Sequence, residues 1–374
     1  MDTVLTYLAQ LVRKARGTSP TAPKSVLLKS FGVIGDYVLL SASFEGYRRL
    51  FPEHRIVLLV RKDVHELAIH NPYIDDIILV DYWSIRRNPF KKVKLWLSLL
   101  HYDFTAVVNL DYSTHYESRD RAVLGWASAE KNIGHQCLDN SAHRDYGRYT
   151  DVILHTKKWV FEIERNNEMV RQLGIPSYNT MTTRIFGIDS YELRPEIKKL
   201  IPPTNYFVVC PGSGSPKNSK CWQPDKFAAI IKKMQQVGYT AILCGSRSET
   251  GIAKNILLNL PASNVLDLTG RTRLMELAFI MKNACMVISN DSSPAHIAAA
   301  VSTQAIVIIG GGQYGRFYPY PDRQYIHPII HEGMDCFYCN WECKYDHYKC
   351  IKDISVETVE NEMMKLIHLG IIRS

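Results

Sequence analysis

The chain lacks the features that mark several large classes of protein. It has no apolar run long enough to cross a bilayer, no P-loop with a Gly-Lys pair before Ser or Thr, and no helix-turn-helix, zinc-finger or RNP-type signature. Its first residues are not typical of a signal peptide, because Thr6 and Gln10 interrupt the apolar run and the basic residues follow it. We therefore expect a cytoplasmic protein without a nucleic acid partner.

The composition predicts a soluble protein of two domains. The 374 residues are 46% hydrophobic and 22% charged, which is enough apolar material for two cores. The formal net charge of +8 suits phosphates, other acidic ligands or an anionic membrane surface. Residues 1–24 combine an amphipathic segment with a Pro/Ser/Thr linker, and the segment forms either a membrane-surface helix or an ordinary docked helix.

Strand-like and helix-like segments alternate in both halves of the chain. Candidate strands lie at 26–31, 55–60, 76–81 and 106–111, and then at 206–212, 240–245, 264–270, 285–289 and 304–311. This alternation predicts an α/β protein with two doubly wound, Rossmann-like domains, at 25–190 and 204–350. We expect the closing helix, within 351–374, to pack back on the first domain. Ligands of such sheets bind at the carboxyl ends of strands, so a central cleft between facing domains would suit a two-substrate reaction.

The first motif, GVIGD at 32–36, follows the first strand. Its glycines permit a tight turn, and Asp36 then falls at the carboxyl end of that strand. Asp36 either faces a ligand or caps the next helix, where a carboxylate suits the helix dipole.

Three motifs in the second half also follow strands. PGSGSPKNSKCW at 211–222 offers backbone N–H groups and Lys220 to a phosphate, or forms a flexible basic loop. Glu249, after Gly245, suits a ribose diol or the first turn of a helix. In NDSSP at 290–294, Ser293 is the expected N-cap with Pro294 at the first helical position, so that the N–H groups of residues 295–296 form an anion site. His296 lies in the same first turn.

Four of the nine cysteines form a cluster, CFYCNWECKYDHYKC. They are Cys336, Cys339, Cys343 and Cys350, and they resemble a structural four-thiolate site for Zn²⁺ or iron, with His347 as a substitute ligand. Disulfides or free thiols are the alternative.

In order along the chain, these motifs resemble glycosyltransferase family 9, the heptosyltransferase-like GT-B enzymes of bacterial lipopolysaccharide core assembly. IGD at 34–36, RRLFP at 48–52, VLLVRK at 57–62 and NPYIDDII at 71–78 resemble the N-terminal domain of the family. The segments 107–135, PGSGSPKNSKCW and 268–300 resemble the following segment and the donor-binding domain, and the cysteine cluster resembles a C-terminal element of many members.

The resemblance implies an inverting transfer of heptose from ADP-heptose to an anionic, lipid A-type lipopolysaccharide core acceptor at the cytoplasmic face of the inner membrane. It implies Asp36 as the base, Lys220 as a diphosphate contact, Glu249 as a ribose contact, Asp291 and His296 as sugar and phosphate contacts, and Gly212, Ser213, Gly245, Ser292 and Ser293 as further donor-binding residues. Gly35 and the basic residues Arg86, Arg87, Lys91, Lys92 and Lys94 would bind the acceptor, unless the basic residues only form a solvated helix face. No Asp-x-Asp pair is present, so we expect catalysis to need no metal.

The chain also departs from the family pattern. Ser293 stands where the family usually has Gly, and Ala42 and Gln223 stand where it usually has Pro. These departures bear on which donor is used. The alternatives are a GT-B transferase with another donor, a nucleotide-sugar epimerase, and a non-catalytic module that binds nucleotide sugar or metal.

Overall fold

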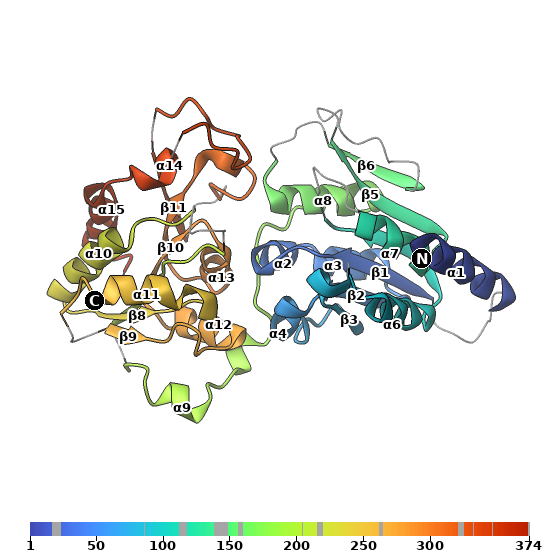
Figure 1. The fold of residues 1–374 in the computed structure, drawn as a ribbon, viewed down its shortest axis with the longest axis horizontal. Coiled ribbons are helices and arrows are strands. Elements are labelled where there is room, and N and C mark those ends of the chain that lie inside the picture. Colours follow the sequence, from blue (N-terminus) through green and yellow to red (C-terminus); the bar gives the residue numbers. More distant parts are fainter. Residues whose placement is uncertain are drawn as a thin grey trace. The chain divides into compact units, whose positions relative to one another are not determined.

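The protein divides into two compact units, Met1–Thr182 and Thr183–Ser374. The computed structural model describes residues 1–16, 24–85, 87–111, 118–137, 149–155, 160–203, 205–214, 220–261, 265–320, 325–331, 333–345 and 347–372. Each unit is built on a six-stranded parallel sheet with helices packed on it (Figure 1). The predicted α/β class is therefore confirmed. Among the described helices, none combines the length and apolar character that a membrane crossing requires.

The sheet of the first unit has the strand order β3-β2-β1-β4-β5-β6. Its strands are β1 Ser25–Ser30, β2 Arg55–Arg61, β3 Asp76–Val80, β4 Phe104–Asn109, β5 Lys131–Cys137 and β6 Asp151–His155, and its helices are α1 Asp2–Arg16, α2 Ile34–Leu40, α3 Phe44–Leu50, α4 His65–Ala68, α5 Tyr82–Ile85, α6 Pro89–Leu100, α7 Ser118–Ala127 and α8 Glu162–Leu173, with a 3₁₀ turn at Lys62–Val64. The four strands predicted in this half match β1 to β4 within two residues. β5 and β6 were not predicted, because their apolar runs are short: one isoleucine in KNIGHQC and three residues in DVILH.

The sheet of the second unit has the order β12-β11-β10-β7-β8-β9. Its strands are β7 Tyr206–Cys210, β8 Thr240–Leu243, β9 Val265–Asp267, β10 Met286–Asn290, β11 Ala305–Ile309 and β12 Ile326–Ile330, and its helices are α9 Pro195–Lys198, α10 Pro224–Gln236, α11 Thr250–Leu257, α12 Leu274–Lys282, α13 Ser293–Ala300, α14 Lys349–Lys352 and α15 Val356–His368, with 3₁₀ turns at Ile188–Ser190, Arg247–Glu249 and Gly311–Gln313. The strand β12 was not predicted. It contains Pro328, which is tolerated because β12 lies at the edge of the sheet.

The C-terminal helix α15 belongs to the second core. Ser355 caps it by accepting a 3.1 Å hydrogen bond from Thr358 N. Its buried residues Val359, Met363 and Leu366 pack in one cluster with residues of β11 and α10. The apolar face of this helix is therefore covered within its own unit, and the expectation that the helix packs back on the first domain stays a prediction.

A buried ion pair holds the end of β1 in the first unit. The side chain of Lys29 is fully buried, and its Nζ lies 2.6 Å from Asp111 Oδ2 and 3.1 Å from Asn109 Oδ1. Asp111 also accepts hydrogen bonds from Phe31 N at 2.7 Å and Gly32 N at 3.1 Å. Because both charges are satisfied, this pair holds the turn that leads to Asp36.

Candidate functional site

Asp36 lies in the first turn of α2, directly after the carboxyl end of β1. Its Oδ2 accepts a 2.8 Å hydrogen bond from Val33 N, so it does cap the helix. A Cβ at position 32 would lie 2.6 Å from Asp36 Cβ, which explains why glycine stands there. The carboxylate is half-buried rather than enclosed, and Gly35 beside it is buried. Asp36 therefore has the position that a ligand-facing carboxylate needs, while its catalytic role stays a prediction.

The basic segment before and within α6 is partly engaged inside the first unit. Lys91 Nζ donates to Asp81 at 2.7 Å, which holds the pKa of that carboxyl at about 2. Lys92 Nζ pairs with Asp2 at 2.9 Å. Within the described residues, Arg87 and Lys94 have no ion-pair partner, and Arg86 lies outside the described residues. Lys91 and Lys92 thus form ion pairs within the first unit, whereas Arg87 and Lys94 could contribute positive charge to an acceptor site.

In the second unit, the predicted motifs meet at one edge of the sheet. The loops that follow β7, β8, β10 and β11 all begin at the carboxyl ends of parallel strands. β7 and β10 are neighbours, and the chain leaves them in opposite directions, toward β8 and toward β11. This is the topological switch point at which doubly wound sheets bind ligands.

Glu249 joins the loops that follow β7 and β8. A Cβ at position 212 would lie 1.8 Å from Glu249 Oε1, and one at position 245 would lie 2.8 Å from its Oε2. Gly212 and Gly245 are therefore needed for the carboxylate to lie between them. Glu249 Oε2 also accepts a 2.6 Å hydrogen bond from Ser246 N, so the first-turn role that we considered is present. A ribose contact remains a prediction.

A residue that the motif analysis did not single out, Asn290, connects these loops. It is fully buried at the end of β10, and its Nδ2 donates to Pro211 O at 2.6 Å. Its Oδ1 accepts a 2.9 Å hydrogen bond from Trp222 N. The sequence did contain a sign of this role. Asn290 is the last residue of an apolar strand, where an amide side chain has no local hydrogen-bond partner and must find one on another segment.

The start of α13 differs from the prediction by one residue. The helix begins at Ser293, and the N-cap position belongs to Ser292, whose Oγ donates to Gly212 O at 3.3 Å. Ala295 N already donates to Ser292 O at 3.1 Å, so this N–H group is not free for the predicted anion site. A contribution of His296 N to that site stays a prediction. Within the described part of the chain, the N–H groups of Ser292 and Ser293 have no assigned acceptor, and they lie at the positive end of the helix.

His296 is buried in the first turn of α13, only 4% exposed. Its Nδ1 lies 2.8 Å from the hydroxyl of Tyr320, and its ring stacks on Tyr318 at 4.9 Å between centroids. These contacts hold the imidazole in one orientation beside the start of the helix.

Asp291, Lys220 and Trp341 form the charged part of the edge. Burial raises the pKa of Asp291 to about 6, while the Lys220 ammonium acts against this shift. Burial also lowers the pKa of Lys220 from its ordinary value, and Asp291 opposes that shift in turn. Lys220 Nζ lies over the Trp341 ring, 3.8 Å from its centroid, which is a cation–π contact.

Trp341 belongs to the cysteine-rich segment, and that segment is held by aromatic packing. Cβ atoms at positions 310 and 312 would each lie 2.6 Å from the Trp341 ring, and a Cβ at position 311 would lie 2.8 Å from the Phe337 ring. The three glycines after β11 therefore make room for these two rings.

The four cysteines of this segment are free thiols, and only Cys350 is buried. Among the described residues, no three His, Cys, Asp or Glu side chains lie close enough together to hold a metal ion. The free-thiol alternative is the one seen here, and a metal site at these thiols stays a prediction. Cys350 lies in the apolar core and the other three thiols lie on partly exposed turns, but all four are near enough to interact electrostatically.

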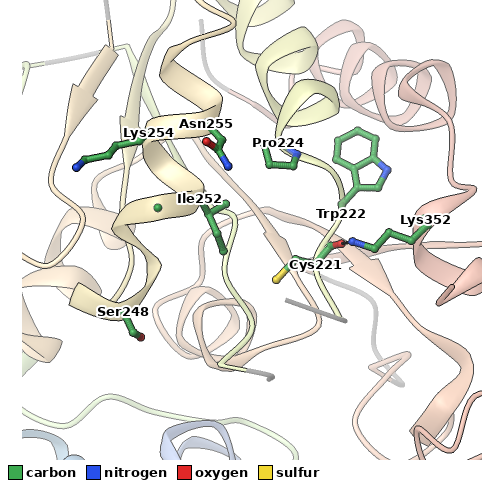
Figure 2. Close-up of a pocket in the computed structure, with 9 residues that line it drawn as sticks. Cys221, Trp222, Pro224, Ser248, Ile252, Lys254, Asn255 and Lys352 are labelled. Atoms are coloured by element: carbon green, nitrogen blue, oxygen red, sulfur yellow. Dashed lines mark hydrogen bonds between the residues drawn. The ribbon is translucent and has the colours of Figure 1, made fainter. Parts of the chain in front are cut away.

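A pocket of about 390 Å³ lies next to the same loops (Figure 2). Cys221, Ser248, Asn255 and Lys352 are among its lining residues. Lys352 Nζ donates to Cys221 O, and Figure 2 shows Lys352 pointing toward Cys221. Cys221 Sγ lies 3.2 Å from Ser213 Oγ. The pocket thus adjoins the loop that carries Lys220.

The raised pKa of Asp291 predicts a pH-dependent effect on stability. Its folded-state pKa lies above the unfolded value of about 4, so the protein loses stability as the pH rises from about 4 through about 6. Asp291→Asn should therefore raise the free energy of unfolding by about 1–3 kcal/mol at pH 8, and the gain should shrink toward zero near pH 4. Urea unfolding across this pH range measures it. A gain that does not change with pH would contradict the prediction.

Comparison with known proteins places the chain in a family. The model of glycosyltransferase family 9 (heptosyltransferase) matches residues 93–348. Lipopolysaccharide heptosyltransferase 3 of Escherichia coli K12 is 27% identical over 300 residues, which are 77% of this chain and 83% of that protein.

Solved structures agree with this match at the level of the fold. The E. coli ADP-heptose lps heptosyltransferase II has a TM-score of 0.71 and 19% identity, covering 92% of this chain and 99% of that chain. The iron-containing dodecameric glycosyltransferase TibC of enterotoxigenic E. coli has a TM-score of 0.56 and 14% identity, covering 93% and 76%. The GT-B fold is thereby confirmed. Because the family model matches more than half of the chain, the protein belongs to glycosyltransferase family 9, the heptosyltransferases, as its motifs predict.

Proposed function

We propose that this enzyme transfers heptose from ADP-heptose to a lipopolysaccharide core acceptor, with inversion at the anomeric carbon. The observation that carries the proposal is the convergence of Gly212, Glu249, Asp291 and the start of α13 at one edge of the second sheet, in a chain of the heptosyltransferase family. The E. coli relatives that act on heptose support the choice of sugar and acceptor.

The donor would bind at this edge through its diphosphate. Lys220 supplies a cation, and Ser292 and Ser293 supply N–H groups at the positive end of α13. His296 lies in the same turn. Glu249 keeps acceptor capacity for a ribose hydroxyl, because a carboxylate has about four lone-pair sites and its assigned bonds use only some of them.

The chemical step needs a base for the acceptor. In the proposal, Asp36 takes the proton of the acceptor hydroxyl while the oxygen attacks the anomeric carbon. The bond between that carbon and the diphosphate oxygen breaks, and its electron pair stays on ADP. Attack opposite the leaving group inverts the anomeric centre, through an oxocarbenium-like transition state. The charge that develops on ADP is stabilised by Lys220 and the start of α13.

The acceptor we propose is anionic and carried by a lipid, as a phosphorylated, Kdo-bearing lipid A core would be. Arg87 and Lys94 are cations of the first unit without an ion-pair partner among the described residues. An enzyme with this acceptor would act at the cytoplasmic face of the inner membrane.

The second candidate is the same reaction with another nucleotide sugar. It is favoured by Ser293, which adds a side chain to the first residue of α13, where the family usually has glycine. Ser293 therefore bears on the shape of the diphosphate site rather than on the type of reaction.

Asp36→Asn tests the assignment of the base. The amide can still accept from Val33 N, so the fold and donor binding should be kept while kcat falls by about 10²–10⁴-fold. ADP release in the presence of acceptor measures kcat, and calorimetry measures ADP binding. Asp63→Asn, an exposed carboxylate after the neighbouring strand β2, is the matched control. A normal kcat in Asp36→Asn would rule out its role as base.

Trp341→Leu tests whether the indole holds Lys220 for the diphosphate. Loss of the cation–π contact should weaken ADP binding by about 3- to 30-fold. Tyr338→Leu, on the same segment and 49% exposed, should leave binding unchanged. In a Lys220→Met background the effect of Trp341→Leu should disappear, because the two residues act as one unit. An equal loss in that background would show that Trp341 acts without Lys220.

A ligand panel tests the donor. ADP-heptose at about 100 times its Kd should stabilise the protein by about 2.7 kcal/mol, whereas UDP- and GDP-sugars should not. Thermal unfolding with each nucleotide sugar measures this. Stabilisation by another sugar nucleotide in preference to ADP-heptose would favour the second candidate.

A further inference from the structure

The first unit carries an exposed apolar surface on two neighbouring helices, α1 and α6. On α1, Val4, Tyr7, Leu8 and Leu11 are exposed, Tyr7 by 61%. On α6, Phe90, Val93 and Leu97 are exposed, Phe90 by 84%. The spacing of three or four residues places each set on one stripe of its helix. We name these seven side chains the α1–α6 surface.

Contacts of the two helices show that α1 and α6 adjoin. Trp96 Nε1 of α6 donates to Leu5 O of α1 at 3.0 Å, and Lys92 pairs with Asp2. Val93 and Leu97 directly follow these two α6 residues, each a further 100° around the helix. They therefore lie outward of the contact with α1.

On α1, the other directions are already occupied. Leu5 and Ala9 are buried, with Leu5 in the core of the first unit. Thr6 faces α7, since a Cβ at position 125 would lie 2.5 Å from its Oγ1. The exposed stripe is thus left on the outer side of α1. Both helices belong to the same unit (Figure 1).

The charge on these helices is predominantly positive. The segments DTVLTYLAQLVRKAR and PFKKVKLWLSLL contain six basic residues and one acidic residue, Asp2. Asp2 is already paired with Lys92. Lys14 and Lys94 have no ion-pair partner within the described ranges. Arg13 and Lys91 are paired with Glu130 and Asp81, so the apolar side chains lie beside a smaller excess of positive charge that includes Lys14 and Lys94.

We propose that the α1–α6 surface docks the enzyme on an anionic lipid surface. Apolar and aromatic side chains enter the boundary between headgroups and acyl chains, and lysines next to them are attracted to anionic headgroups. A protein partner fits less well, because lysine is depleted in protein interfaces. This docking rests on the proposed function in one respect, because a lipid-linked acceptor would be located at the membrane surface to which the enzyme binds.

Vesicle co-sedimentation of the full chain tests the proposal. Vesicles of phosphatidylcholine and phosphatidylglycerol at 3:1 should bind the protein, and phosphatidylcholine alone should bind it at least tenfold more weakly. Tyr7→Ser with Leu11→Ser, and separately Phe90→Ser with Leu97→Ser, should each weaken binding to the anionic vesicles by tenfold or more. Leu258→Ser with Leu369→Ser is the matched control, since these side chains are 84% and 62% exposed on the second unit.

Several results would overturn the proposal. One is unchanged vesicle binding in both double variants. Another is an oligomer of the wild type, seen by sedimentation velocity, that the same variants dissociate while vesicle binding is kept; the surface would then join copies of the chain. Because the substituted side chains are exposed, the thermal unfolding midpoint should not move. If the α1 variant does not fold, the α6 variant decides the question.

Activity assays separate this inference from the proposed function. On a water-soluble, deacylated core acceptor, both double variants should keep wild-type turnover of ADP-heptose. On the same acceptor held in anionic vesicles by its acyl chains, they should lose at least tenfold in kcat/KM. If the wild type transfers heptose to neither acceptor, the proposed function fails, and vesicle binding alone still decides the docking surface.

Discussion

The candidate site of the second unit depends on the two hydrogen bonds of the buried Asn290 side chain. It donates to Pro211 O and accepts from Trp222 N, and so it joins the end of β10 to both ends of the loop that follows β7. Lys220 lies in that loop, two residues before Trp222, and Asp291 follows Asn290 directly. Because a buried amide without its partners is destabilising, these bonds hold the cation and the carboxylate near each other.

The two units use buried charge for different purposes. In the first unit, Lys29 and Asp111 are both satisfied by several hydrogen bonds, and they hold the turn before Asp36. In the second unit, burial raises the pKa of Asp291 even with Lys220 near it, so its negative charge is held at a cost in stability. A charge kept under that condition is typical of a binding or catalytic site, whereas a fully satisfied pair is typical of a structural one.

Much of the fold and the order of the site motifs could be predicted from the sequence. Apolar runs identified β1 to β4, and the turn residues after strands identified the loops that carry Asp36, Gly212, Gly245 and Asp291. The errors came from contacts between distant segments. The helix α13 starts one residue earlier than predicted because Ser292 bonds to Gly212. Asn290 was passed over because its partners lie far away along the chain.

By itself, the sequence determined the α/β class, the family and the residue types at each strand end, because periodicity and turn chemistry act over a few residues. Only the tertiary structure decided which of those residues meet. Strand order places β7 beside β10, packing places Trp341 over Lys220, and α15 is covered by its own unit. These contacts depend on how whole helices and strands pack against one another, which cannot be derived from sequence patterns of a few residues. The same holds for the α1–α6 surface, since an amphipathic pattern shows that a helix has an apolar face but not which side of it the core leaves exposed.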